Sequence, residues 1–520
     1  MNADNTNSEH RKADATIVDN VIVNSTVWRY LDDHADDDID SLALHAKLPW
    51  KQGTGESNAA VKTPRCPDLA WVLQQISGRQ IAARKLPSWA QMAHMLYPSR
   101  VPMEQCSSQQ AADYKAQLVL QLVRTLGQGE VPARFTFADL TGGFGVDCAA
   151  IAQHAEHAYY VERNEQLCTL VEHNYEQLGL GDHVEVHHGD ARDFLASMPS
   201  VDVIMLDPAR RDAQGKRTYA LVDCEPNVLE LVGDLAQKAH FVLLKLSPML
   251  DWHKTVADLA PFASEVHIVS VKNECKELLV VLDMRRTSQD YQREHLYRLV
   301  CVDLGAHVEQ RRKSEGNAGR EGSAGSRDSR GCEDGTGSAS REACSGSASR
   351  EASSGSASRE ASSASASCVS VRTFTVRGEA QMNAVTPVRE NTDNLEGQLL
   401  WEPNASVMKA GCFGAFAQAF GAEAVGENSH LFVGGRLEIA STIPAKGFVI
   451  EQVCGFSKKE VRELTSTLTH ANIVVRNAPF TPASLRKKLK LKDGSDVTLF
   501  ATTNARNEHV LIRAKRVASE

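Results

Sequence analysis

The sequence Phe137-Ala-Asp-Leu-Thr-Gly-Gly-Phe-Gly145 runs from an apolar strand into a glycine-rich turn, and residues 146–154 then have the character of a helix. Glycine lets a backbone pass close to a ligand, and the first turn of a helix offers unpaired N–H groups to an anionic group. A dinucleotide fingerprint would need a third glycine three residues after Gly145, but position 148 is cysteine. The stretch therefore indicates a ligand-binding turn of a different kind.

Acidic residues end the strands that follow this turn. Glu162 closes the apolar run at 157–161, and Asp190 follows the run at 183–187. An acid at the end of the second strand can accept both hydroxyl groups of a ribose, and we expect the acid after the third strand to meet an adenine amino group. The sequence thus predicts an adenosyl pocket formed by Asp139, Thr141, Gly143, Gly145, Glu162 and Asp190.

Apolar runs and amphipathic stretches alternate through this region, which predicts a parallel sheet with helices on both faces. The expected strands are residues 135–140, 157–161, 183–187, 201–206, 240–246, 265–271 and 277–283. Only residues 272–276 separate the last two, too few for a helical crossover, so these two strands should pair antiparallel. This α/β arrangement resembles the Rossmann-like sheet of class I methyltransferases.

The fourth expected strand leads into Asp207-Pro-Ala-Arg-Arg211. In methyltransferases that act on exocyclic amines, this loop carries a second proline and an aromatic ring, which Ala209 and Arg210 replace here. A guanidinium group can stack on a base through its plane. We therefore expect Asp207, Pro208 and Arg210 to form the catalytic loop.

The same loop also resembles the Asp-Pro-Pro-Arg loop of RNA uracil-C5 methyltransferases. Those enzymes need a nucleophilic cysteine after the fifth strand, where this sequence has Lys245-Leu-Ser-Pro-Met249. Methylation of carbon through a covalent adduct is therefore disfavoured. A nitrogen acceptor already has a lone pair and needs only positioning and proton removal, which favours N-methylation.

Composition divides the 520-residue chain into segments of different character. The net charge is −9, yet residues 445–520 hold 14 Lys and Arg against 7 Asp and Glu, so the positive charge is concentrated there. The 57 residues of 311–367 contain no large apolar side chain, which is typical of disorder. We expect a disordered acidic arm (1–55), a helical region (60–128), a methyltransferase domain (130–285), a connecting β-rich region (286–310 and 368–440), the disordered Ser/Ala/Gly-rich insert (311–367) and a small basic α/β domain (445–520).

Short motifs occur in an order that is similar to one family of proteins. They are Cys106-Ser-Ser, DLTGGFGVD (139–147), DPARRD (207–212), KLSPMLD (245–251), VKNECKELL (271–279), WEPNASVMKAG (401–411), NIVVRN (472–477) and LRKKLKLKDG with LFAT (485–501). The chain resembles bacterial class I S-adenosylmethionine-dependent methyltransferases with a carboxyl-terminal THUMP-like domain, and more distantly the RNA cap guanine-N2 methyltransferases. The resemblance implies S-adenosylmethionine as cofactor and structured RNA (tRNA or rRNA) as partner. The RNA would contact Arg486, Lys487, Lys488, Lys490 and Lys492.

Three hypotheses follow from the sequence. The first is an enzyme that methylates an exocyclic or ring nitrogen of an RNA base. The second is a small-molecule or protein methyltransferase that uses its basic domain for oligomerisation, and the third is a non-catalytic RNA-binding protein. The twelve cysteines form no CxxC pair, which disfavours structural zinc, and no signal peptide or membrane span is recognisable, so we expect a cytoplasmic protein.

Overall fold

The computed structural model describes residues 15–18, 20–50, 65–127, 134–210, 221–289, 297–305, 371–392, 394–436 and 442–517. The predicted insert at 311–367 lies outside these residues. No helix in the described ranges is long and apolar enough to cross a membrane.

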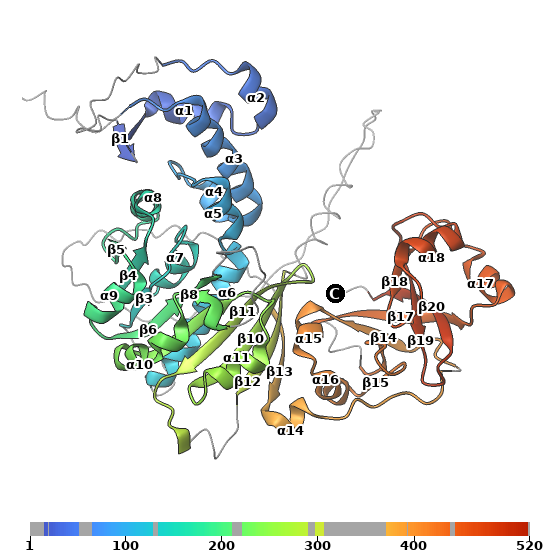
Figure 1. Cartoon of the computed structure of the whole chain (residues 1–520). Helices are drawn as coiled ribbons and strands as arrows, with labels where there is room; N and C mark the ends of the chain where they lie inside the picture. Colours follow the sequence, from blue (N-terminus) through green and yellow to red (C-terminus); the bar gives the residue numbers. More distant parts are fainter. Residues whose placement is uncertain are drawn as a thin grey trace, which may run out of the picture. The chain divides into compact units, whose positions relative to one another are not determined.

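A nine-stranded sheet forms the centre of the first part of the chain (Figure 1), in the order β13-β12-β10-β11-β9-β6-β3-β4-β5. Its strands are β3 (Thr136–Asp139), β4 (His157–Glu162), β5 (Val184–His188), β6 (Val201–Leu206), β9 (Ala239–Leu246), β10 (Ala263–Val271), β11 (Glu274–Asp283), β12 (Arg298–Leu304) and β13 (Val371–Arg377). The strands β3, β4, β5, β6 and β9 are parallel. The predicted antiparallel pair is confirmed, because β11 lies between β9 and β10 and runs against both. Two strands from the region that we expected to be connecting and β-rich, β12 and β13, extend this sheet.

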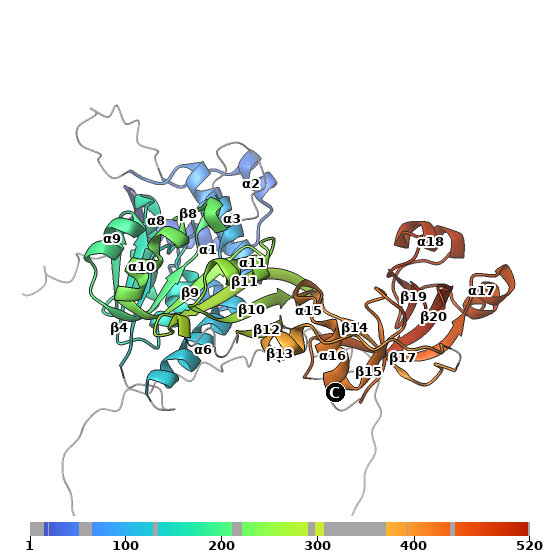
Figure 2. The same cartoon turned by 60° about the horizontal axis from the view of Figure 1, so that its bottom comes forward.

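Helices cover both faces of the sheet, because its strands alternate their apolar side chains between two cores (Figure 2). In β6, Ile204 and Leu206 pack in one core with α9–α11, whereas Val203 and Met205 pack in the other with α6–α8. These helices are α6 (Gln109–Leu126), α7 (Val146–Ala152), α8 (Glu165–Gln177), α9 (Ala191–Ser197), α10 (Val228–Lys238) and α11 (Trp252–Asp258).

The amino-terminal residues are more ordered than the sequence led us to expect. Residues 15–50 contain β1 (Ala15–Val18), β2 (Val21–Asn24), α1 (Ser25–Asp33) and α2 (Ile39–His45), followed by α3 (Leu69–Lys85), α4 (Pro87–Gln91) and α5 (Arg100–Gln105). The prediction of a disordered arm over 1–55 is therefore wrong for residues 20–50. Polar residues of this stretch cap helices, as Asn24 does for α1 and Asp38 for α2, while Val27 and Leu31 pack on Ile76 of α3.

The last part of the chain builds a second sheet of seven strands, in the order β15-β16-β14-β17-β20-β19-β18. Its strands are β14 (Leu399–Pro403), β15 (Ala422–Ala424), β16 (Phe432–Gly434), β17 (Ala445–Cys454), β18 (Asn472–Val475), β19 (Val497–Thr503) and β20 (His509–Arg516), and its helices are α14 (Gly378–Met382), α15 (Ala405–Ala410), α16 (Phe413–Phe420), α17 (Lys458–Thr465) and α18 (Pro482–Leu489). Ser457 caps α17 and Thr481 caps α18. Two sequence motifs meet here, because Ala405 N–H, at the start of α15, donates to Asn273 Oδ1 (3.0 Å).

Candidate active site

The glycine-rich turn connects β3 to α7 and is held from behind by two tyrosines. Tyr160 Oη donates to the carbonyl of Gly143 (2.5 Å), and Tyr175 Oη donates to that of Gly145 (2.9 Å). A Cβ atom on Gly142 would lie 2.1 Å from the ring of Tyr160, so only glycine fits at that position. The sequence gives no sign of this role, since a tyrosine in a strand, like Tyr160, or in a helix, like Tyr175, usually contributes only to packing.

The turn contacts the acid at the end of the next strand. Gly143 N–H donates to Glu162 Oε2 (3.0 Å), and Asn164 N–H donates to Glu162 Oε1 (2.9 Å). Each carboxylate oxygen can accept a further hydrogen bond. A Cβ atom on Gly143 would have no heavy atom within 4 Å, so the turn borders open space. Glu162 and Gly143 thus form one wall that a ligand can approach.

The third predicted acid lies at the same edge of the sheet, because β3, β4 and β5 are adjacent and parallel. Asp190 caps α9 by accepting from Arg192 N–H (2.8 Å), and its side chain remains 36% exposed. Gly189 beside it also borders open space. Tertiary structure thus brings Glu162 and Asp190 to one edge, as their positions after consecutive strands predict.

Asp139 and Thr141 support the turn from inside. Asp139 is buried, and its carboxylate accepts from Thr141 N–H (3.1 Å). Burial raises the pKa of Asp139 to about 7. The hydroxyl of Thr141 accepts from Asp207 N–H (2.6 Å), so Thr141 joins the turn to the predicted catalytic loop. Both residues therefore have structural roles beside any contact with a ligand.

The loop after β6 presents a carboxylate beside this edge. Asp207 is 41% exposed at its side chain, and Lys245 Nζ donates to its Oδ2 (2.6 Å). Pro208 is buried, and residues 209–210 form the short strand β7 (Ala209–Arg210), which pairs with β8 (Cys224–Glu225). The side chain of Arg210, our expected stacking group, lies outside the described parts of the structure.

Lys245 lies near the carboxyl end of the fifth parallel strand, β9, and begins the segment in which a nucleophilic cysteine would stand in the uracil-C5 enzymes. Its Nζ also lies 3.3 Å from Asp147 Oδ2, at the start of α7. Burial alone would lower the pKa of Lys245, but Asp207, Asp147 and Glu277 outweigh burial and hold this pKa well above its usual value. Lys245 therefore stays charged and is placed to position Asp207.

A buried network of charges continues from Lys245 to the amino-terminal helices. Lys115 on α6 is fully buried, and its Nζ donates to Glu277 Oε2 (2.6 Å) and Ser107 Oγ (3.0 Å) and lies 3.1 Å from Asp147 Oδ1. Ser107 Oγ in turn donates to Asp147 Oδ2 (2.7 Å). Burial would raise the pKa of Asp147, but Lys115 and Lys245 hold it below its usual value. Motifs that lie far apart in the sequence therefore meet in one ion network behind the site.

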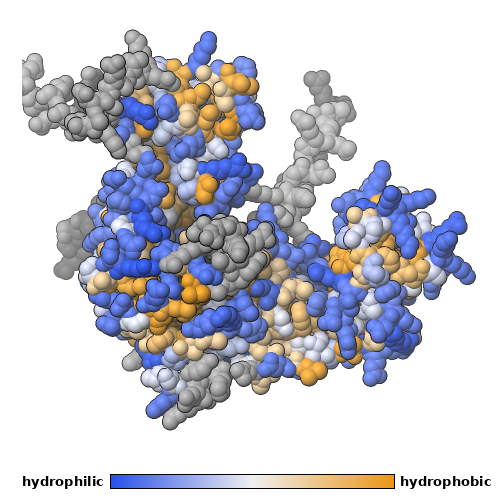
Figure 3. Space-filling view, viewed as in Figure 1, coloured by the Kyte–Doolittle hydropathy of each residue, from blue (hydrophilic) through white to orange (hydrophobic). Residues whose placement is uncertain are grey.

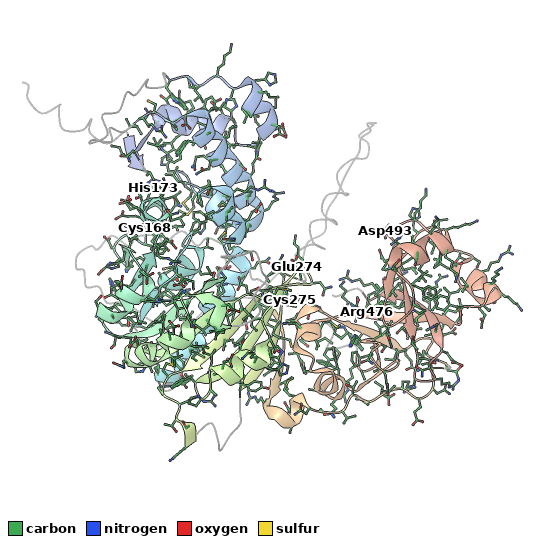
Figure 4. The ribbon with its side chains drawn as sticks, viewed as in Figure 1. Cys168, His173, Glu274, Cys275, Arg476 and Asp493 are labelled. Carbon is green, nitrogen blue, oxygen red and sulfur yellow. The ribbon has the colours of Figure 1, made fainter. Side chains whose placement is uncertain are left out.

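The predicted RNA-contacting residues differ in their surroundings on the carboxyl-terminal domain. Arg486 pairs with Asp493 (2.7 Å; Figure 4 labels Asp493) and donates to the carbonyl of Ala471 (3.2 Å), so it serves the domain itself. Lys488 lies over two phenylalanine rings. The remaining three lysines are exposed: Lys487, Lys490 and Lys492.

Among the described residues, no group of three or more His, Cys, Asp and Glu side chains is arranged to hold a metal ion.

Comparison with protein families divides the chain into three matched regions. Residues 128–230 match a family described as conserved hypothetical protein 95, residues 399–439 match a ferredoxin-like domain, and residues 445–516 match a THUMP domain-like family. No curated protein matches the sequence. The ferredoxin-like match falls in the region that we expected only to be connecting and β-rich.

One solved structure is similar to nearly the whole chain. A candidate methyltransferase from Porphyromonas gingivalis W83 is 24% identical, with a TM-score of 0.65 over 95% of this chain and 98% of its own. M. capricolum TrmK bound to S-adenosyl-homocysteine (10% identity, TM-score 0.26, 34% of this chain and 68% of its own) and M. jannaschii tRNA m1G37 methyltransferase (10%, 0.25, 35% and 52%) are too distant to carry an argument. The link to RNA cap guanine-N2 methyltransferases stays a prediction. The chain therefore has the fold of a class I methyltransferase, joined to a carboxyl-terminal domain that matches the THUMP-like family.

Proposed function

We propose that the protein is an S-adenosylmethionine-dependent methyltransferase that modifies a nitrogen atom of a base in structured RNA. One observation carries the proposal: the glycine turn and the Glu162 carboxylate are in hydrogen-bond contact at the edge where three parallel strands end. In open α/β sheets, ligands bind outside the carboxyl ends of the strands.

The residues present fit the cofactor. Glu162 supplies carboxylate oxygens for two ribose hydroxyls, and Asp190 supplies an acceptor for an adenine amino group. The turn at Gly143 offers backbone beside open space for the methionine end. Asp139, Thr141 and Gly145 keep this turn in shape. When bound, the cofactor supplies an electrophilic methyl group.

The catalytic role falls to the loop at Asp207. Its carboxylate can accept a hydrogen bond from the target amine and so hold the nitrogen lone pair toward the methyl carbon. As the new bond to nitrogen forms, the nitrogen loses a proton to Asp207 or to water. Lys245 holds Asp207 in position, and Thr141 holds the loop backbone. We keep Pro208 and Arg210 as further loop residues of this proposal.

Charge supports an RNA substrate. Residues 445–520 hold 14 basic and 7 acidic residues, whereas the whole chain has a net charge of −9. Contacts between lysines and phosphates supply affinity for RNA without selecting its sequence. Comparing nucleoside digests of total RNA from parent and deletion cells tests the proposal. One methylated nucleoside should be missing from the deletion cells, and purified protein with labelled cofactor should restore it. If the two digests are identical and the protein labels no RNA, a small-molecule or protein substrate replaces RNA.

Changing Glu162 to alanine tests the cofactor pocket. We expect S-adenosylmethionine binding to weaken by about 1–3 kcal/mol, because the variant cannot form charge-assisted hydrogen bonds to the ribose. Isothermal titration calorimetry measures this change. Glu165→Ala, an exposed change on α8, is the matched control and should bind as the parent does. If Glu162→Ala binds S-adenosylmethionine as tightly as the parent does, Glu162 does not contact the cofactor.

Changing three exposed lysines of the group Arg486, Lys487, Lys488, Lys490 and Lys492 tests RNA binding. A triple alanine variant of Lys487, Lys490 and Lys492 should bind all RNA sequences more weakly. The slope of log affinity against log salt should flatten by about 0.7–0.9 for each phosphate that the variant no longer neutralises. Filter binding at several salt concentrations gives the slope.

The control for this variant makes the same change of net charge elsewhere. It replaces three exposed lysines outside the carboxyl-terminal domain by alanine: Lys47, Lys254 and Lys276. This control should keep the slope of the parent. Equal slopes for both triple variants would show that Lys487, Lys490 and Lys492 make no local contact with RNA.

A further inference from the structure

A hollow on the carboxyl-terminal domain lies at the start of α18, the helix whose last turn carries Arg486, Lys487 and Lys488. It has a volume of about 620 Å³, within the range of small-ligand pockets. Its lining comes from the segment that follows β18, the start of α18 and the turn between β19 and β20, with Asn477, Phe480, Thr481, Asn507 and His509 among its residues. Figure 3 shows apolar surface on the β18–α18 side of this domain, framed by hydrophilic side chains.

An aromatic wall bounds the hollow. Phe480 stacks on Phe456, with ring centroids 4.7 Å apart and planes inclined by 24°. Lys488 Nζ lies 5.2 Å from the centroid of Phe480 and 5.5 Å from that of Phe456, so a cation sits over both rings. His509 approaches Phe480 edge-on at 6.4 Å. Phe480 is only partly buried although it lines a cavity, so part of the ring remains available to a ligand.

The lining also includes polar side chains that are held in place. Thr503 Oγ1 donates to the carbonyl of Asn477 (2.5 Å) and lies 3.1 Å from His509 Nδ1. Asn477 donates from its side chain to the carbonyl of Glu427 (2.8 Å). These contacts fix the segment that carries Phe480, so the hollow is formed in advance of any ligand.

We infer that this hollow binds one unpaired nucleotide of an RNA, an inference that rests on the RNA substrate proposed above. The face of a half-buried aromatic ring stacks on any base, and a lysine at its edge can neutralise the adjoining phosphate. The excess of 14 basic over 7 acidic residues in 445–520 favours an anionic occupant over a neutral or basic one. The nucleotide would be positioned by stacking, and the exposed lysines would hold the helical part of the same RNA.

The test compares two fluorescein-labelled probes with the full-length protein by fluorescence anisotropy. One probe is a single-stranded oligoadenylate of ten nucleotides, and the other is a blunt-ended RNA duplex. Phe480→Ala should lower the affinity for the single-stranded probe by about 5- to 150-fold, which corresponds to about 1–3 kcal/mol of binding free energy for one stacked base. Duplex affinity should stay within about twofold of the parent, and Phe480→Tyr, which keeps the ring, should restore single-strand binding.

Two further variants guard against a trivial loss of folding. Phe262→Ala removes a partly buried phenylalanine from the other sheet and should leave both affinities unchanged. Asn507→Asp places a negative charge in the hollow at a turn with φ of 60°, a conformation that aspartate also tolerates, and should weaken the single-stranded probe at least about threefold through repulsion of its phosphates.

The outcomes separate this inference from the proposed function. If the parent binds both probes and Phe480→Ala and Asn507→Asp bind them equally well, the hollow is not a nucleotide site, although RNA binding stands. If the parent binds the duplex alone, the inference fails in the same way. If the parent binds neither probe and labels no RNA, the proposed function fails and the inference fails with it.

Discussion

Replacing Lys115 by methionine is expected to destabilise the protein by about 3–5 kcal/mol. The ammonium group is fully buried between Glu277 and Asp147, so its removal leaves the buried carboxylate of Glu277 without its ion-pair partner and Asp147 with Lys245 in place of two lysines. Methionine retains the length of the side chain, which limits any cavity to the missing nitrogen. Urea unfolding at pH 7, followed by tryptophan fluorescence, measures the change.

The pH dependence of this destabilisation identifies its electrostatic cause. In the parent, Asp147 has a lowered pKa, so its contribution is present above about pH 4 and is lost as the pH falls through the folded-state pKa. The difference between parent and variant should therefore persist down to about pH 4 and shrink below it. Lys254→Met, at an exposed pair with Asp258, should cost less than about 1 kcal/mol at either pH. A Lys115→Met variant as stable as the parent at pH 7 would show that the network contributes nothing.

Changing Asp207 to alanine should lower the rate of methyl transfer by about 10²–10⁴-fold while S-adenosylmethionine affinity stays near that of the parent. The carboxylate is the exposed acid of the loop beside the cofactor edge, and loss of a positioned proton acceptor has effects of this size. Transfer of a labelled methyl group to RNA from deletion cells gives the rate, and calorimetry gives the affinity.

Matched variants separate chemistry from folding at this loop. Asp234→Ala, an exposed change on α10, should retain the parent rate. Lys245→Met should lower the rate but leave the hydrogen bond between Asp207 N–H and Thr141 intact, because that hydrogen bond does not involve the lysine. Lys245→Arg, which keeps the charge, should recover part of the rate. If Asp207→Ala transfers the methyl group at the parent rate, residues 207–210 are not the catalytic loop.

The sequence alone was sufficient to predict seven of the nine strands of the main sheet and the edge at which Glu162 and Asp190 lie. Apolar runs of strand length, separated by helical stretches, specify a parallel sheet, and residues that directly follow adjacent parallel strands must share an edge. Glu162 and Asp190 are local to their strand ends, so no long-range contact was needed to place them. The caps at Ser457 and Thr481 are likewise local, because a capping side chain bonds within three residues.

Tertiary structure alone decided the contacts between residues far apart in the chain. An isolated lysine such as Lys115 or Lys245 resembles a surface residue in the sequence, because burying a charge is costly without a partner that only folding supplies. The prediction of disorder for the amino-terminal acidic stretch was wrong for the same reason, since its apolar side chains are buried only when they pack on α3. Phe456 and Phe480 lie 24 residues apart, and their stack beneath Lys488 forms only when the segments after β17 and β18 are brought together by the second sheet.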